Sequence, residues 1–162
     1  MHAPDGYDYN GFFQGCYSLQ EVIFLPNQSN IVACPDTAKQ MFAGCRNLLA
    51  GPTQINFSNC EYAQELFAGC RMLSSLPAYN FEALLDAPRM FQGTYCKTQS
   101  FLNSILAMCL TMECYEGDMT LSNGSRGRPD DTTLGLSSEQ ISEIDTTTQL
   151  YEDFVDMGWS LT

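Results

Sequence analysis

The sequence predicts an α/β solenoid in which each repeat contributes one strand and one short helix, closed by a helical C-terminal cap. Three observations lead to this fold class: a short motif that recurs along the first hundred residues, a proline and an extended segment after its copies, and helical patterns after the last copy. Units of about 20–50 residues that recur in this way bury their apolar faces only against their neighbours. We therefore expect a repeat region, residues 1–99, and a capping region, residues 100–162.

The recurring motif is phenylalanine, one variable residue, glycine and cysteine. Its glycine and cysteine positions are Gly15-Cys16, Gly44-Cys45 and Gly69-Cys70, with a degenerate fourth copy at Gly93-Thr94. The steps are 29 residues (from 16 to 45), 25 residues (from 45 to 70) and 24 residues (from 70 to 94). Equivalent positions in a stack point the same way, so these cysteines are expected to be small buried thiols in one column rather than disulfides.

The unit spanning residues 60–81 shows the plan of a repeat. Residues 61–68 combine good helix formers with apolar residues on one face, so a short helix is expected there. Gly69 ends that helix, because a C-terminal cap needs a residue that tolerates positive φ. Leu73 then turns inward, as Leu48 does in the preceding unit. A proline opens an extended segment at residues 78–81, equivalent to residues 53–57 one unit earlier.

The capping region is predicted from helix signals that follow the repeats. Residues 100–112 are rich in Leu, Ile, Met and Ala and form the helix expected to cover the last unit. Residues 117–136 are polar and are expected to make a loop or hairpin. Ser137 and Gln140 have the spacing of a capping box for a helix through about Ile144.

A last helix is expected at the end of the chain. The pattern Thr146-x-x-Gln149 favours a helix start, and the helix runs to Met157. Gly158 occupies the position after the cap, so Trp159 is expected to pack on Phe154 in a Schellman ending.

Charge excludes several classes of function. The 162 residues carry 19 Asp and Glu against 7 Lys and Arg, a net charge of −12. Nucleic-acid binding needs clustered cations, so no nucleic-acid partner is expected. No apolar run approaches the roughly 18 residues of a membrane span, so membrane insertion is not expected either. The first ten residues lack the apolar stretch of a secretory signal. We expect the chain to act where it is made or to leave by assembly into a larger particle.

Catalytic and metal chemistry are not predicted. His2 is the only histidine, which leaves Ser-His and Cys-His pairs without a base. Arg46 and Arg71 directly follow two of the motif cysteines and are expected to be exposed turn residues rather than activators of a thiolate. The acidic pair Asp130 and Asp131 lacks the spacing of a calcium loop. The sequence therefore predicts no enzyme, no metal and no cofactor.

The unit (Met/Leu)-Phe-x-Gly-Cys-x-x-Leu, followed by Leu-Pro and a strand ending in Asn-Phe, resembles the BspA-like leucine-rich repeats. These are surface-protein repeats of gut and oral bacteria, their phages and some protists, and the match covers Gly11 to Cys96. The resemblance implies a short right-handed leucine-rich-repeat solenoid that binds proteins or surfaces. In the fourth unit Thr94 replaces the cysteine and Lys97 the leucine, so the array is expected to end there.

The C-terminal segment adds a second resemblance. Its Gly-Leu-Ser-Ser-Glu-Gln, Tyr-x-x-Phe-Val and Gly-Trp elements are similar to the C-terminal segment of phage-encoded BspA-like proteins. We therefore expect a bacteriophage virion accessory protein, on the capsid or the tail, that contacts other virion proteins or the host surface. A bacterial cell-surface adhesin module and an intracellular scaffold are the alternatives.

Expected partners are other virion or surface proteins, with host glycans as a further possibility, in a multi-protein assembly. The acidic charge favours a partner with a basic or polar face. Contact residues are predicted at outward positions of the extended segments, Gln54, Asn56 and Asn80, because their neighbours belong to the core. The alternative for the two asparagines is a hydrogen bond to the backbone of the turn.

Overall fold

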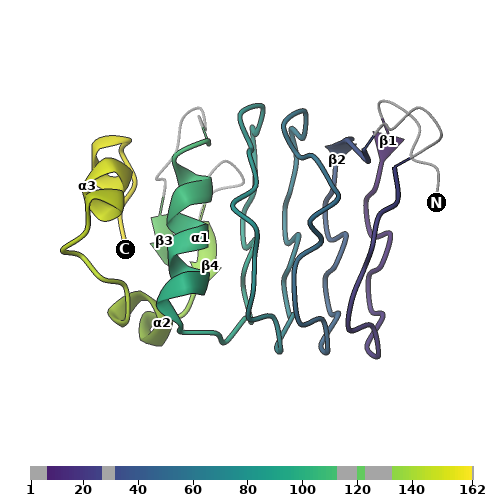
Figure 1. Ribbon diagram of the computed structural model, residues 1–162, viewed down its shortest axis with the longest axis horizontal. Coiled ribbons are helices and arrows are strands. Elements are labelled where there is room, and N and C mark those ends of the chain that lie inside the picture. The colour runs from purple at the N-terminus through teal and green to yellow at the C-terminus, as the bar shows by residue number, and fades with distance from the viewer. Residues whose placement is uncertain (1–6, 27–31, 113–119, 123–132, 162) are drawn as a thin grey trace.

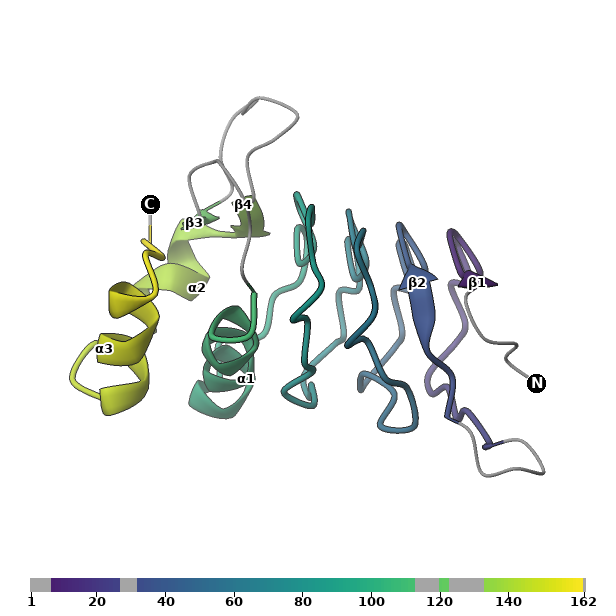
Figure 2. The same ribbon diagram turned by 90° about the horizontal axis from the view of Figure 1, so that it is seen from above.

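The computed structural model describes residues 7–26, 32–112, 120–122 and 133–161. Successive stretches of the chain lie side by side from the N-terminal end, and the helices lie at the other end (Figure 1; Figure 2). The elements in chain order are β1 (Tyr7–Asp8), β2 (Pro35–Thr37), α1 (Gln99–Cys109), β3 (Thr120–Ser122), β4 (Thr133–Leu136), α2 (Ser138–Ser142) and α3 (Gln149–Asp156). Strands β1 and β2 pair in parallel, and so do β3 and β4.

Four equivalent segments form one side of this stack: residues 9–17, 38–46, 63–71 and 87–95. Alternate N–H groups of each segment donate to carbonyls of the next. The N–H of Phe13 lies 2.8 Å from the oxygen of Met41, and the N–H of Phe42 lies 3.0 Å from that of Leu66. The N–H groups between them close turns within their own segment, as from Cys45 to Phe42 at 3.0 Å. About half of the N–H groups of a segment therefore bond within that segment, and the other half bond to the next segment.

Residues 61–68, which we expected to form a short helix, contain a parallel bridge residue, Tyr62, and consecutive turns from residue 64 onward instead. Glu65, in the middle of this stretch, has φ of 54°, and its equivalents Gln40 and Arg89 have φ of 56° and 58°. A right-handed helix cannot contain such residues. The apolar spacing was misleading because the buried residues Ala63, Leu66, Phe67 and Cys70 recur at the intervals of a helix face although the backbone between them turns. Positive φ recurs four residues apart instead, at Glu65 and Gly69.

The core contains a column of phenylalanine rings, one from each segment. The rings of Phe13 and Phe42 are 5.4 Å apart and inclined by 8°, and those of Phe42 and Phe67 are 5.3 Å apart and inclined by 4°. Phe91 continues the column at 6.0 Å from Phe67 and 5°. Nearly identical ring orientations require the backbones to repeat with the same geometry. The column of rings therefore shows that the segments stack as equivalent units.

The extended segments form the other side of the stack. Buried and exposed side chains alternate along them, as expected. Asn56 is exposed between buried Ile55 and Phe57, and Asn80 is exposed between buried Tyr79 and Phe81. They are not continuous strands. Ile55 makes an isolated parallel bridge with Ala33, and the rings of Phe57 and Phe81 stack at 5.1 Å. Side chains therefore hold these segments together as much as the backbone does.

The strand β4 continues the ladder beyond the fourth segment. The N–H of Arg89 lies 2.6 Å from the oxygen of Thr133, and that of Phe91 lies 2.9 Å from the oxygen of Leu134. The expected hairpin is wrong where the structure describes this stretch, because β3 and β4 are parallel and a hairpin pairs antiparallel strands. The remainder, residues 117–119 and 123–132, lies outside the described residues.

Helix α1 lies beside the last repeat segments, as predicted, and ends at Cys109 rather than Met112. Its N-cap Thr98 accepts a hydrogen bond from the N–H of Phe101, and six of its apolar residues are buried. Helix α3 packs beyond it. The indole N–H of Trp159 donates to the buried carbonyl of Cys109 at 3.0 Å, which connects the end of the chain to α1.

Of the N-caps predicted for the last two helices, the one at Ser137 is confirmed and the one at Thr146 is wrong. Ser137 and Gln140 make the reciprocal capping box at the start of α2, which ends at Ser142 rather than Ile144. The N-cap of α3 is Thr148, not Thr146, and it accepts from the N–H of Tyr151. At its end Gly158 has φ of 92°.

The Schellman ending itself is also confirmed. The N–H of Trp159 bonds the oxygen of Phe154 at 3.3 Å, and the N–H of Gly158 bonds the oxygen of Val155 at 2.9 Å. The rings of Phe154 and Trp159 stack at 5.9 Å.

Candidate functional site

The glycines of the motif form a column in which neighbouring backbones touch. A β-carbon added to Gly44 would lie 3.6 Å from Cα of Gly15, and one added to Gly69 would lie 3.5 Å from Cα of Gly44. At Gly93 the corresponding distance to Gly69 falls to 3.3 Å. All four have φ between 72° and 77°. The left-handed backbone favours glycine at all four positions, and at Gly93 a β-carbon would also crowd the neighbouring backbone. With Ala43, the column forms a surface floor without large side chains.

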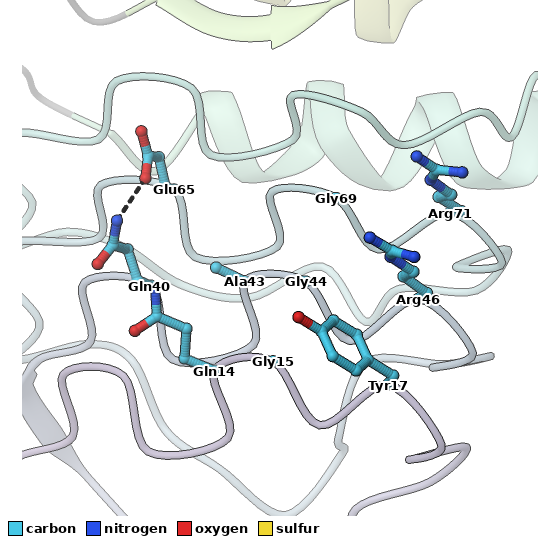
Figure 3. A pocket seen from close by; sticks show the side chains of 10 residues that line it. All are labelled: Gln14, Gly15, Tyr17, Gln40, Ala43, Gly44, Arg46, Glu65, Gly69 and Arg71. Atoms are coloured by element: carbon cyan, nitrogen blue, oxygen red, sulfur yellow. Dashed lines mark hydrogen bonds between the residues drawn. The ribbon is translucent and has the colours of Figure 1, made fainter.

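A groove of about 330 Å³ lies over this floor. Figure 3 shows Tyr17, Arg46 and Arg71 along one side of it. These three residues occupy the position directly after the motif cysteine in successive units, and Tyr95 occupies it in the fourth unit. The guanidinium of Arg46 lies over the ring of Tyr17, 4.9 Å from its centroid. Tyr17 and Tyr95 are 59% and 60% exposed, so this wall presents aromatic and cationic groups to solvent.

The opposite side of the groove carries amide and carboxylate groups, from Gln14, Gln40 and Glu65 (Figure 3). The side-chain amide of Gln40 donates to one carboxylate oxygen of Glu65 at 2.6 Å. Arg89 forms an ion pair with the other oxygen at 2.7 Å. Gln40, Glu65 and Arg89 are the residues with positive φ described above. Their side chains are therefore linked to one another along equivalent positions of three successive segments. Both oxygens of Glu65 are thereby occupied.

The backbone N–H groups of the floor are used within the stack. The N–H of Gly15 bonds the oxygen of Ala43 at 2.8 Å, that of Gly44 bonds Ala68 at 2.7 Å, and that of Gly69 bonds Gln92 at 2.7 Å. A ligand in the groove therefore meets side chains and glycine Cα atoms rather than free main-chain donors.

The motif cysteines lie beneath the floor and bond to the neighbouring unit. The thiol of Cys45 donates to the carbonyl of Phe13 at 3.1 Å, and that of Cys70 donates to the carbonyl of Phe42 at 3.1 Å. Burial raises the pKa of Cys45 to about 11 and that of Cys70 to about 12. Such thiols stay protonated at neutral pH and are poor nucleophiles. Cys16 departs from the expectation and is exposed, since it belongs to the first described unit.

The structure places the predicted contact residues away from the groove. Gln54, Asn56 and Asn80 are exposed, as expected. The side-chain oxygen of Asn56 accepts from the N–H of Ser58 at 3.0 Å, and that of Asn80 accepts from the N–H of Glu82 at 2.9 Å. Each asparagine thus holds its own turn, which is the alternative considered above. The inward leucines Leu48 and Leu73 are fully buried, as predicted.

Sequence reasoning treated Arg46 and Arg71 as exposed turn residues and did not recognise the row they form with Tyr17. The signal was present: aligning the four motif copies places Tyr17, Arg46, Arg71 and Tyr95 in one register. The sequence does not give the geometry of the turns, and it is this geometry that places the row on the surface beside the glycine column.

Within the described ranges, no group of three His, Cys, Asp or Glu side chains is placed to hold a metal ion. None of the helices in that part of the chain is long and apolar enough to cross a membrane. His2, Asp130 and Asp131 lie outside the described residues. Comparison with known proteins gives no match: no family model, no curated protein and no solved structure resembles the chain significantly.

Proposed function

We propose that the chain is a non-enzymatic interaction protein built on a leucine-rich-repeat type solenoid, and that it serves as an accessory protein of a bacteriophage virion. The observation that carries the interaction role is the groove over the glycine column, to which three successive units contribute equivalent residues. A stack of short units offers an extended surface on which the same contact recurs from unit to unit.

Two further features support a binding role over catalysis. The buried motif thiols are held protonated and bonded to neighbouring carbonyls, so they act as packing groups. The side chains that line the groove come from turns whose backbone is fixed by the ladder, which pre-organises a surface for a partner. The virion assignment depends on the sequence resemblance of the repeats and the C-terminal segment to phage-encoded BspA-like proteins.

Fractionation of the source tests the proposal. Purified phage particles, the cell envelope and the soluble cytosol are separated, and the chain is quantified in each by mass spectrometry. We expect it in the particles at a fixed ratio to the major capsid protein. Recovery only in the envelope would replace the virion role by the adhesin role, and recovery only in the cytosol would contradict both.

A further inference from the structure

The groove over the glycine column has a charge that differs from that of the whole chain. The chain carries a net charge of −12, yet Arg46 and Arg71 stand next to each other on one wall of the groove (Figure 3). Among the described residues, neither arginine takes part in an ion pair, whereas Arg89 is paired with Glu65 at 2.7 Å. Two adjacent guanidinium groups without a carboxylate partner attract an anion.

The spacing of the two arginines favours a ligand with repeated charges. They come from equivalent positions of successive units, whose core rings lie 5.3 Å apart between Phe42 and Phe67. A ligand that runs along the stack would therefore meet one cation from each of these two units, Arg46 and then Arg71. Tyr17, at the end of this row, has an exposed ring, and the face that Arg46 does not cover can pack against a flat, partly apolar group.

The remaining surface of the groove discriminates between kinds of polyanion. A peptide that adds a strand to a sheet edge pairs its backbone with free main-chain groups, but the N–H groups of Gly15, Gly44 and Gly69 are already bonded within the stack. The facing wall offers the amides of Gln14 and Gln40, which can donate to and accept from hydroxyl groups. A ligand with carboxylates on one edge and hydroxyls on the other fits both walls.

From this arrangement we infer that the groove binds an acidic polysaccharide of uronate residues, with its carboxylates on Arg46 and Arg71 and its hydroxyls toward Gln14 and Gln40. The sugar ring at the end of the bound segment packs on Tyr17. Glu65 does not oppose the ligand, because Arg89 and Gln40 occupy its carboxylate. The inference rests on the proposed interaction role and names the ligand of that surface.

Calorimetric titration of the full chain with trigalacturonate tests the inference. We expect binding at physiological salt, where the Debye length of about 8 Å limits repulsion by distant carboxylates. Fully methyl-esterified trigalacturonate, which keeps the sugar chain and loses the charges, should bind at least about tenfold more weakly. Each of Arg46→Gln and Arg71→Gln should weaken binding of the acid by about tenfold or more, the effect of losing a hydrogen bond to a charged group.

Matched variants separate the groove from the overall charge. Lys97→Gln removes one positive charge from a residue that does not line the groove, as many as each arginine variant removes from it, and should leave the affinity within about twofold. Tyr17→Phe should keep the affinity and Tyr17→Ser should lower it, since the ring and not the hydroxyl makes the contact. Circular dichroism melts confirm that each variant is folded.

Three results would overturn the inference: no binding of trigalacturonate, equal binding of its methyl ester, or tighter binding of hexaglutamate, which would make the ligand an acidic peptide. These failures are distinct from failure of the proposed function. Recovery in virions without binding of uronates would leave the proposed function intact. Recovery only in the cytosol would contradict the virion role whatever the titrations give.

Discussion

The side-chain amide of Gln140 donates to the hydroxyl of Thr94 at 3.2 Å and to the carbonyl of Cys96 at 3.1 Å. Thr94 is the residue that replaces the motif cysteine in the fourth unit, and both Thr94 and Gln140 are 1% exposed. The hydroxyl itself donates to the carbonyl of Phe91 at 2.8 Å, so it accepts from the cap and donates to its own turn. The departure from the repeat is therefore the point at which the capping region is attached.

Removing this hydroxyl should loosen the cap. Thr94→Val keeps the shape of the side chain and leaves a buried amide of Gln140 with one acceptor fewer, so we expect a loss of about 1–2 kcal/mol in the free energy of unfolding. Urea denaturation measures it. Thr53→Val, at an exposed position, is the control and should change stability by less than about 0.5 kcal/mol. Equal effects of the two variants would contradict a specific role for the contact.

The glycine column should tolerate alanine least where the backbones are closest. Gly93→Ala and Gly15→Ala both place a β-carbon on a residue with positive φ, which costs about 1–2 kcal/mol. Only in Gly93→Ala does the new atom meet a neighbouring backbone, at 3.3 Å, while at Gly15 it meets the ring of Tyr17 at 3.9 Å. Urea unfolding should show that Gly93→Ala is the more destabilising by at least about 1 kcal/mol. The reverse order would exclude backbone contact as the reason for the glycines.

The left-handed residues make a further prediction at Gln40. Gln40→Ala and Gln40→Gly both lose the hydrogen bond to Glu65, but glycine adopts a φ of 56° without the steric cost that alanine incurs. The glycine variant should therefore be more stable than the alanine variant by about 1 kcal/mol, the reverse of their order in a helix. Thermal melts of the pair decide between the turn structure and the helix that the sequence favoured.

Stability should fall at alkaline pH because of the buried thiols. Burial raises the pKa of Cys60 and of Cys70 to about 12 and that of Cys45 to about 11, whereas an unfolded cysteine titrates near about 8.5. Above about pH 8.5 the unfolded chain loses protons that the folded chain keeps. The stabilisation is therefore complete below that pH and declines as the pH rises toward 11 to 12.

Urea unfolding at pH 7 and at pH 10 measures this decline. Cys70→Ala should reduce the difference between the two pH values, because it removes one of the buried groups. Exposed Met72, which carries no titratable group, is the control, and Met72→Ala should leave the difference unchanged. An unaltered difference in Cys70→Ala would show that other groups cause the alkaline loss.

Much of the stack was predictable from the sequence by itself. The spacing of the Phe-x-Gly-Cys copies places the phenylalanines, the glycines and the inward leucines in register. The structure stacks the rings, aligns the glycines and buries Leu48 and Leu73. The caps at Ser137 and around Gly158 were also predictable, because each depends on hydrogen bonds between residues at most five positions apart. Local chemistry fixes such features with little help from the rest of the fold.

Only the tertiary structure decided what the turns look like and what they display. Glu65 has a positive φ because alternate N–H groups of its segment donate to carbonyls of the next segment. The helix propensities of the residues do not include this constraint. The same turns send Arg46 and Arg71 outward beside the glycine floor. The hydrogen bonds of β4 to Arg89 and Phe91 and the link from Gln140 to Thr94 join residues more than 40 positions apart, and such contacts depend on how the whole chain packs.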